Sequence, residues 1–187
     1  MSYPATLSSI FEDEIVAAHV GVGRALAQHV LEVARASGYD CHQLHLVDVH
    51  TPAEYYALLG REFQFPTPVV NDHGAIDWMS DLEWLGQYPG HVVVVDGLAD
   101  LRSHNPNIFG ALVYMFPHVL DRMRSGDERY HVFFVESDPL LVKSIIDELE
   151  QANAILSADS EVGSCINPSN PVPIVDHRRG RRSNAHA

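Results

Sequence analysis

The sequence has 187 residues, of which 46% are hydrophobic. This length and composition suit one globular domain with extensions, and they exclude a chain that is disordered throughout. The formal net charge of −13 argues against nucleic acid as the main partner, because the phosphates would be repelled. All 25 acidic residues lie at or before Asp176, and four of the 12 basic residues follow it. We therefore expect an acidic body that binds a basic protein.

The N-terminal part carries helical signals. Apolar residues recur from Ile15 to Ala34 at spacings that favour a helix, and Gly38 suits a C-terminal cap. Gly21 and Gly23 weaken the middle, so one long helix and two short ones both remain open. We predict that residues 1–40 form a helical segment added to the body.

The body, predicted at residues 41–154, alternates strand and helix patterns. The strands are predicted at Gln43–Val49, His91–Asp96 and Tyr130–Val135. The helices are predicted at about Thr51–Phe63, Asn71–Leu85, 106–123 and 138–149. This order predicts an α/β fold with a small three-stranded parallel sheet covered by helices. Periodicity fails after about Ala154, so residues 155–187, which include an Arg-Arg-Gly-Arg-Arg run, are predicted to be a flexible tail.

The cysteines, the lack of long apolar runs and the N-terminal residues indicate the cellular compartment. Cys41 and Cys165 have no CxxC or metal-type spacing, which predicts unpaired thiols in a reducing compartment. No apolar run approaches the roughly 20 residues of a transmembrane helix. The N-terminus lacks the basic start and apolar run of a signal peptide. We therefore expect a cytoplasmic protein that does not bind membranes.

Sequence motifs for catalysis are missing. The chain has no GxGxxG after a predicted strand, no P-loop, no GxSxG and no HExxH. Gly21-Val22-Gly23 precedes a predicted helix but follows no predicted strand. His42 and His45 could share a turn, but no histidine and carboxylate set has metal spacing. We expect no enzymatic activity, no cofactor and no metal site.

The acidic stretch from Glu62 to Leu101 contains seven acids and neither Lys nor Arg. A helical wheel of its predicted helix separates a core side from an exposed side. The core side has Ala75, Trp78, Met79, Leu82 and Leu85. The exposed side has His73, Asp77, Ser80, Asp81 and Trp84, with Ile76 and Glu83 beside it. Carboxylates around an aromatic residue favour a binding face for a basic partner, although a solvated helix with an incidental Trp has the same pattern.

The same stretch resembles the barstar family of intracellular ribonuclease inhibitors. The family pattern is roughly FP-x-Y-[YF]-G-x-N-x-D-A-[LF]-x-D-x-L-x-D-L-x-W, and the resemblance covers about residues 43–135. His73 stands where the family has the first of two key aspartates, and the loop holding Pro68-Val69-Val70 is one residue shorter. The matching residues are Phe65, Pro66, Asn71, Asp77, Met79, Asp81, Leu82 and Trp84.

The resemblance implies a barstar-like fold and a function. The protein would be an immunity protein that blocks a ribonuclease toxin, 1:1, by placing carboxylates where the substrate phosphates bind. Asp77 would be the central phosphate mimic and Asp81 a second anion, and Asp121 would supply a further acid. The implied hydrogen-bonding contacts are Asn71 and Ser80, the apolar contacts are Ile76 and Trp84, and His73 would alter partner choice. The departures from the pattern leave a second possibility open, namely a toxin that is not a ribonuclease or another basic partner.

Overall fold

The computed structural model of the chain describes residues 16–124, 126, 128–163 and 173–177. Its strands are β1 (Val16–Val22), β2 (Asp40–His45), β3 (Gly90–Asp96), β4 (Arg129–Val135) and β5 (Ile174–Asp176). Its helices are α2 (Arg24–Ala36), α3 (Pro52–Glu62), α4 (Asp72–Ser80), α5 (Leu98–His104), α6 (Pro106–Met123) and α7 (Pro139–Gly163), with a short 3-10 helix, η1, at Glu83–Leu85.

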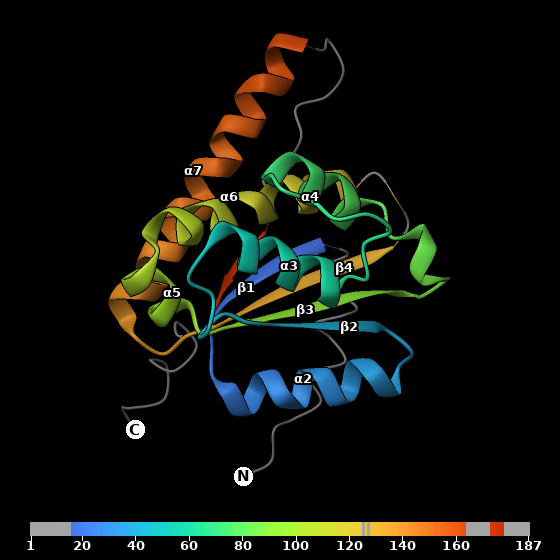
Figure 1. Cartoon of the computed structure of the whole chain (residues 1–187), viewed down its shortest axis with the longest axis horizontal. Helices are drawn as coiled ribbons and strands as arrows, with labels where there is room; N and C mark the ends of the chain where they lie inside the picture. Colours follow the sequence, from blue (N-terminus) through green and yellow to red (C-terminus); the bar gives the residue numbers. More distant parts are fainter. Residues whose placement is uncertain (1–15, 125, 127, 164–172, 178–187) are drawn as a thin grey trace, which may run out of the picture.

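The strands form one five-stranded sheet in the order β2-β3-β4-β1-β5, and every pairing is parallel. Helix α2 covers one face, while α3, α4, α6 and α7 lie on the other (Figure 1). Residues 90–95 of β3 are all buried, as expected for a central strand that is covered on both faces. The α/β class and the parallel sheet are thus confirmed.

The prediction of three strands was wrong, because the N-terminal part contributes a fourth. Val16–Val22 is strand β1, which pairs with β4 from Val16 opposite Tyr130 to Val20 opposite Phe134. A strand that is buried on both faces shows no alternation, so its apolar residues also fit a helical spacing. Gly21, with a φ of 76°, lies where the register shifts between Val20 and Val22. The helix of this region begins only at Arg24.

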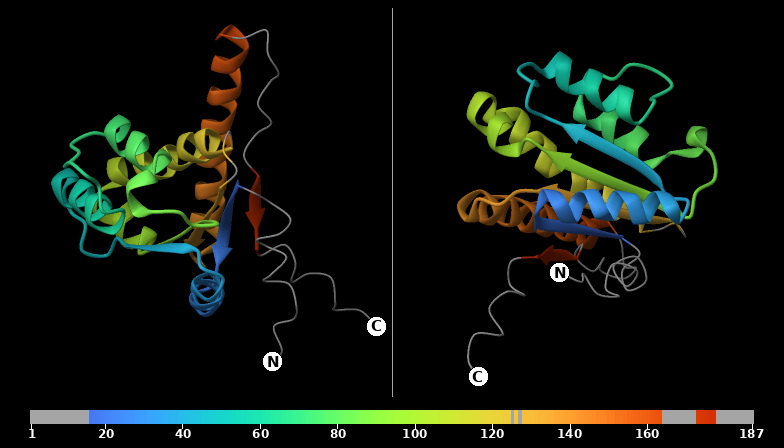
Figure 2. Two further views of the ribbon diagram at one scale, coloured as in Figure 1. Left: turned by 90° about the vertical axis from the view of Figure 1, so that its right-hand side faces the viewer. Right: turned by 90° about the horizontal axis from the view of Figure 1, so that it is seen from below.

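The C-terminal part contributes the fifth strand. Helix α7 continues to Gly163, and β5 pairs with β1, with Ile174 opposite Ala18 and Asp176 opposite Val20. Figure 2 shows β5 beside β1 at the edge of the sheet. A strand of three residues has no detectable period, which is why the sequence pattern predicted a tail. Cys165 and the run of four arginines lie outside the described residues.

The start of helix α3, which was predicted from its capping residues, is confirmed. Thr51 Oγ1 accepts a hydrogen bond from Glu54 N at 3.3 Å, and Glu54 Oε2 accepts one from Thr51 N at 2.9 Å, which completes a capping box. Helix α6 runs through Pro117 and lies against α4 and α7. Within the described part of the chain, no helix combines the length and apolarity needed to cross a membrane.

Candidate partner-binding face

Helix α4 begins at a side-chain cap. Asn71 Oδ1 accepts a hydrogen bond from Gly74 N at 2.8 Å, so this exposed residue already has a structural role. Asp72, the first helical residue, accepts a hydrogen bond from the hydroxyl of Tyr56 at 3.0 Å. These contacts fix the start of α4 against α3, and they leave His73 exposed one residue further on.

Replacing Asn71 with Ala is expected to lower the free energy of unfolding by about 1 kcal/mol, because Gly74 N loses its acceptor. Chemical denaturation of the two proteins measures the difference. Asn71→Asp is the matched control, since an aspartate also caps a helix and adds a favourable charge at its N-terminus. Equal losses in both variants would contradict a capping role.

Helix α4 ends at Ser80, five residues before the predicted end at Leu85. The hydroxyl of Ser80 donates a hydrogen bond to the carbonyl of Ile76 at 2.7 Å, which competes with the helical pattern. Asp81 then adopts an extended conformation, which lets Leu82 turn into the core, where it is 5% exposed. Asp81 and Trp84 therefore follow the helix instead of lying on it.

Burial separates the predicted contact residues into two groups. His73, Asp77 and Asp81 are exposed. Ile76 is only 6% exposed and packs in the core, so its predicted place beside the exposed face was wrong. The wheel misplaced it because α4 is covered by α6 as well as by α3. Trp84 is half-buried, packs on the core and donates a hydrogen bond from Nε1 to the carbonyl of Phe63 at 3.2 Å.

The central carboxylate has a tertiary partner. Asp77 Oδ1 lies 2.5 Å from a guanidinium nitrogen of Arg122, on α6. The acidic stretch lacks cations in sequence, but packing of α4 on α6 brings this one to it. Both side chains are exposed, at 67% for Asp77 and 51% for Arg122, so the pair adds little to stability. Asp121, the residue before Arg122, is half-buried.

An apolar groove lies next to the start of α4. It has a volume of about 590 Å³ and lies between α3 and the loop that leads to Asn71. Val70 in this loop is 81% exposed, so it adds an apolar side chain to this surface. Pro68 and Val70 are exposed and Val69 is partly buried against the core, so the Pro68-Val69-Val70 departure from the family pattern was the signal for such a surface. The lining residues are Pro52, Ala53, Tyr56, Ala57, Gly60, Phe65, Thr67, Pro68, Val69 and Val70.

A smaller cavity of about 330 Å³ lies at the carboxyl ends of β1, β3 and β4. Ligands of parallel sheets commonly bind at this edge. Gly21-Val22-Gly23 does end a strand there, contrary to the prediction. Asp96 in this cavity pairs with Arg24 at 3.1 Å and lies 3.8 Å from His45. Asp96 is therefore already paired within the protein, as Asp77 is on α4.

Buried histidines are the second feature that the sequence did not reveal. His19 Nδ1 lies 3.2 Å from His177, and His19 Nε2 lies 3.2 Å from His131. Burial, followed by the two neighbouring rings, lowers the pKa of His19, so this ring stays neutral at neutral pH. A separate group joins Asp40 and His42 of β2 with His91 of β3. No spacing in the sequence reveals either group, because each one joins residues from distant parts of the chain.

Comparison with known proteins places these observations in a family. A sequence model described as barstar (barnase inhibitor) matches residues 39–135. No curated protein matches the chain. A solved structure, a Walker-type ATPase of Pyrococcus abyssi, is 13% identical and superposes with a TM-score of 0.47, covering 91% of this chain and 51% of that chain. This chain therefore spans about half the length of that ATPase chain. Since the family match covers more than half of its residues, the chain belongs to the barstar family.

Proposed function

We propose that the protein is an inhibitor of a barnase-like ribonuclease and that the exposed side of α4 enters the active site of the enzyme. The observation that carries the proposal is the family match over residues 39–135, which contains α4 with Asp77 exposed on it. Active sites that bind phosphates are basic, so a carboxylate on a rigid helix can take the place of a phosphate. The inhibition would be by occlusion, without turnover by this chain.

The contacts divide by exposure. Asp77 is the central anion, Asp81 the second, and His73 meets the partner at the first turn of α4. Asn71 and Ser80 contribute through the backbone that they fix, since their side chains already bond to Gly74 and Ile76. Trp84 supplies a half-buried apolar surface, and the half-buried Asp121 precedes in sequence the Arg122 that Asp77 binds in the free protein.

Asp77→Ala is expected to weaken binding to barnase, used as the probe, by at least about 2 kcal/mol, which is roughly 30-fold. Its stability should change little, because the lost ion pair is exposed. Binding is measured by inhibition of ribonuclease activity and by association rates at several salt concentrations. The association rate of the parent should fall steeply with salt.

Two further variants sharpen this test. Glu32→Ala removes a carboxylate that is 62% exposed on α2, on the opposite face of the sheet, and should bind like the parent. Arg122→Ala removes the cation that competes for Asp77, and should speed association. If Asp77→Ala and Glu32→Ala inhibit as well as the parent, Asp77 does not contact the ribonuclease.

A second candidate function keeps the fold but changes the partner. The apolar groove, exposed Val70 and His73 at an aspartate position favour a surface that differs from that of a barnase inhibitor. The partner would then be a toxin of another class or another basic protein. Co-expression with toxins of both kinds, scored by growth, separates these functions. Rescue only from a toxin that is not a ribonuclease would support the second candidate.

A further inference from the structure

Three side chains with metal-binding chemistry meet where β2 and β3 begin. Asp40 and His42 are two residues apart on β2, so they point to the same side of the sheet. His91 is paired with Asp40 in the register of β3. All three lie on the side that α3 and α4 cover, since Leu44 and Val93, which continue the same alternation, pack in that core.

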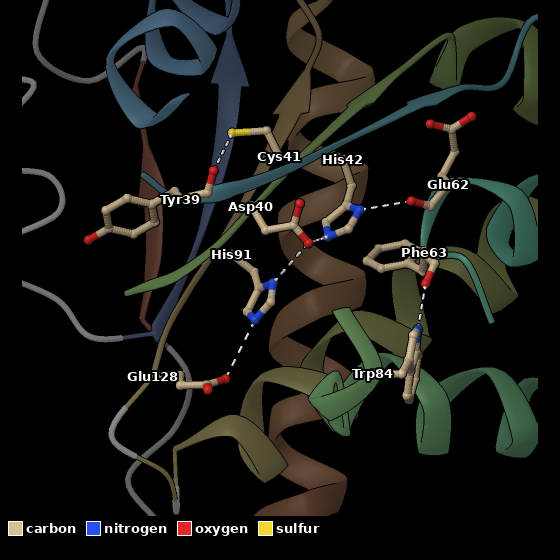
Figure 3. Close-up of polar contacts among 9 residues, drawn as sticks. All are labelled: Tyr39, Asp40, Cys41, His42, Glu62, Phe63, Trp84, His91 and Glu128. Carbon is tan, nitrogen blue, oxygen red and sulfur yellow. Dashed lines mark hydrogen bonds and ion pairs between the residues drawn. The ribbon is translucent and has the colours of Figure 1, made fainter. Parts of the chain in front are cut away.

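The inner atoms of this cluster lie close together. Asp40 Oδ2 is 3.0 Å from His42 Nε2 and 3.6 Å from His91 Nδ1, and the three atoms all lie within 4.8 Å of one another. Figure 3 shows the three side chains converging. Each of these atoms is buried, and none has a hydrogen bond of acceptable geometry. Native proteins rarely leave buried polar atoms in this state without an ion or water that satisfies them.

The outer nitrogens show where the ring protons lie. His42 Nδ1 is 2.9 Å from the carbonyl oxygen of Glu62, which can only accept, so Nδ1 carries the proton. His91 Nε2 lies 3.5 Å from a carboxylate oxygen of Glu128, so its proton is favoured there. In the neutral rings, Nε2 of His42 and Nδ1 of His91 then present lone pairs to Asp40. Lone pairs on three converging atoms repel one another, and either a cation between them or a second proton on each ring would relieve that repulsion.

We propose that Asp40, His42 and His91 bind one divalent transition-metal ion, with Zn²⁺ as the best match. A tetrahedral zinc ion with bonds of about 2.0–2.1 Å holds its ligand atoms about 3.3 Å apart. The two measured separations, 3.0 and 3.6 Å, lie on either side of that value. Imidazole ligands select zinc and its neighbours over Mg²⁺ and Ca²⁺. Histidine ligands whose other nitrogen faces a carbonyl or carboxylate are the usual arrangement around such ions.

The ion would have a structural role. It joins β2 to β3, and His42 also stacks on Phe63, with ring centroids 4.2 Å apart. The carbonyl of Phe63 accepts the hydrogen bond of Trp84, so the site supports the segment that follows α4 (Figure 3). His42 and His91 are each 2% exposed in their side chains, and Asp40 is 20% exposed, which leaves the ion an entry at Asp40.

The test begins with the full chain, treated with a chelator and dialysed. Titration with Zn²⁺ in a calorimeter is expected to show one ion per chain, and added Zn²⁺ is expected to raise the melting temperature. Co²⁺ serves as a spectroscopic probe, because four-coordinate Co²⁺ bound to imidazole gives visible absorption bands. Absence of stoichiometric binding would overturn the proposal and leave two protonated histidines around Asp40 as the explanation of the cluster.

Variants locate the ion. His42→Asn and His91→Asn are expected to lose at least about 100-fold in Zn²⁺ affinity, and Glu128→Gln about 10-fold. His45→Asn is the matched control, because His45 is on the same strand but 65% exposed, and it should bind like the parent. If the ligand variants do not fold, shifts of the His42 and His91 ring signals on adding Zn²⁺ to the parent decide the matter. Unchanged affinity in the folded variants, or unchanged ring signals, would refute the site.

Discussion

Replacing Val20 with Asp is expected to destabilise the fold by more than about 4 kcal/mol, enough to unfold a protein of ordinary stability. Val20 is 0% exposed in β1, which lies between β4 and β5. An aspartate there would be a buried charge without a partner. The backbone at position 20 is paired with β4 on one side and with β5 on the other, so the strand cannot shift easily to expose the charge. Urea denaturation followed by circular dichroism measures the loss.

Ala25→Asp provides the control for the added charge. Ala25 is exposed in the first turn of α2, where a carboxylate interacts favourably with the helix dipole. This variant should be as stable as the parent or slightly more stable. A Val20→Asp protein with an unchanged denaturation midpoint would mean that the N-terminal strand is dispensable and that the body folds without it.

Gly90→Ala is expected to cost about 3 kcal/mol of folding stability, because an added methyl group has no room. A Cβ atom at this position would lie 2.4 Å from the carbonyl oxygen of Arg129 and 2.9 Å from the ring of Tyr39. The first contact is with the backbone of β4, so relief requires the paired strands to separate at their start. Thermal and chemical denaturation both measure the effect.

The matched control is Gly110→Ala, the same change within α6. Nothing lies within 4 Å of a Cβ atom at Gly110, and alanine favours a helix. This variant should be more stable than the parent by about 0.5–1 kcal/mol. A loss of stability in Gly90→Ala together with a gain in Gly110→Ala would establish the close approach at Gly90. A change of stability in the same direction for both variants would contradict it.

The elements with local signals were predictable from the sequence. The start of α3 was predicted from Thr51, Pro52 and Glu54, whose side chains and backbone interact within one turn. Strand β3 was predicted from its unbroken run of valines. These features depend on neighbours in sequence, so the pattern contains the information that determines them.

The remaining features depend on distant contacts. Strand β1 exists because β4 and β5 pair with it, and its own residues also fit a helix. Asp77 meets a cation only because α6 packs on α4, and Ile76 is buried for the same reason. The group of Asp40, His42 and His91 was not predicted, because β2 begins three residues earlier than predicted and because His91 comes from another strand.

Strand β5 also bears on how copies of the protein behave towards one another. Its backbone occupies the open side of β1, with hydrogen bonds from Ala18 N to the carbonyl of Pro173 and from His177 N to the carbonyl of Val20. An uncovered β1 would offer unpaired amides and carbonyls along a very apolar strand, a template on which a second chain could add. The short strand β5 therefore protects the sheet against edge-to-edge aggregation.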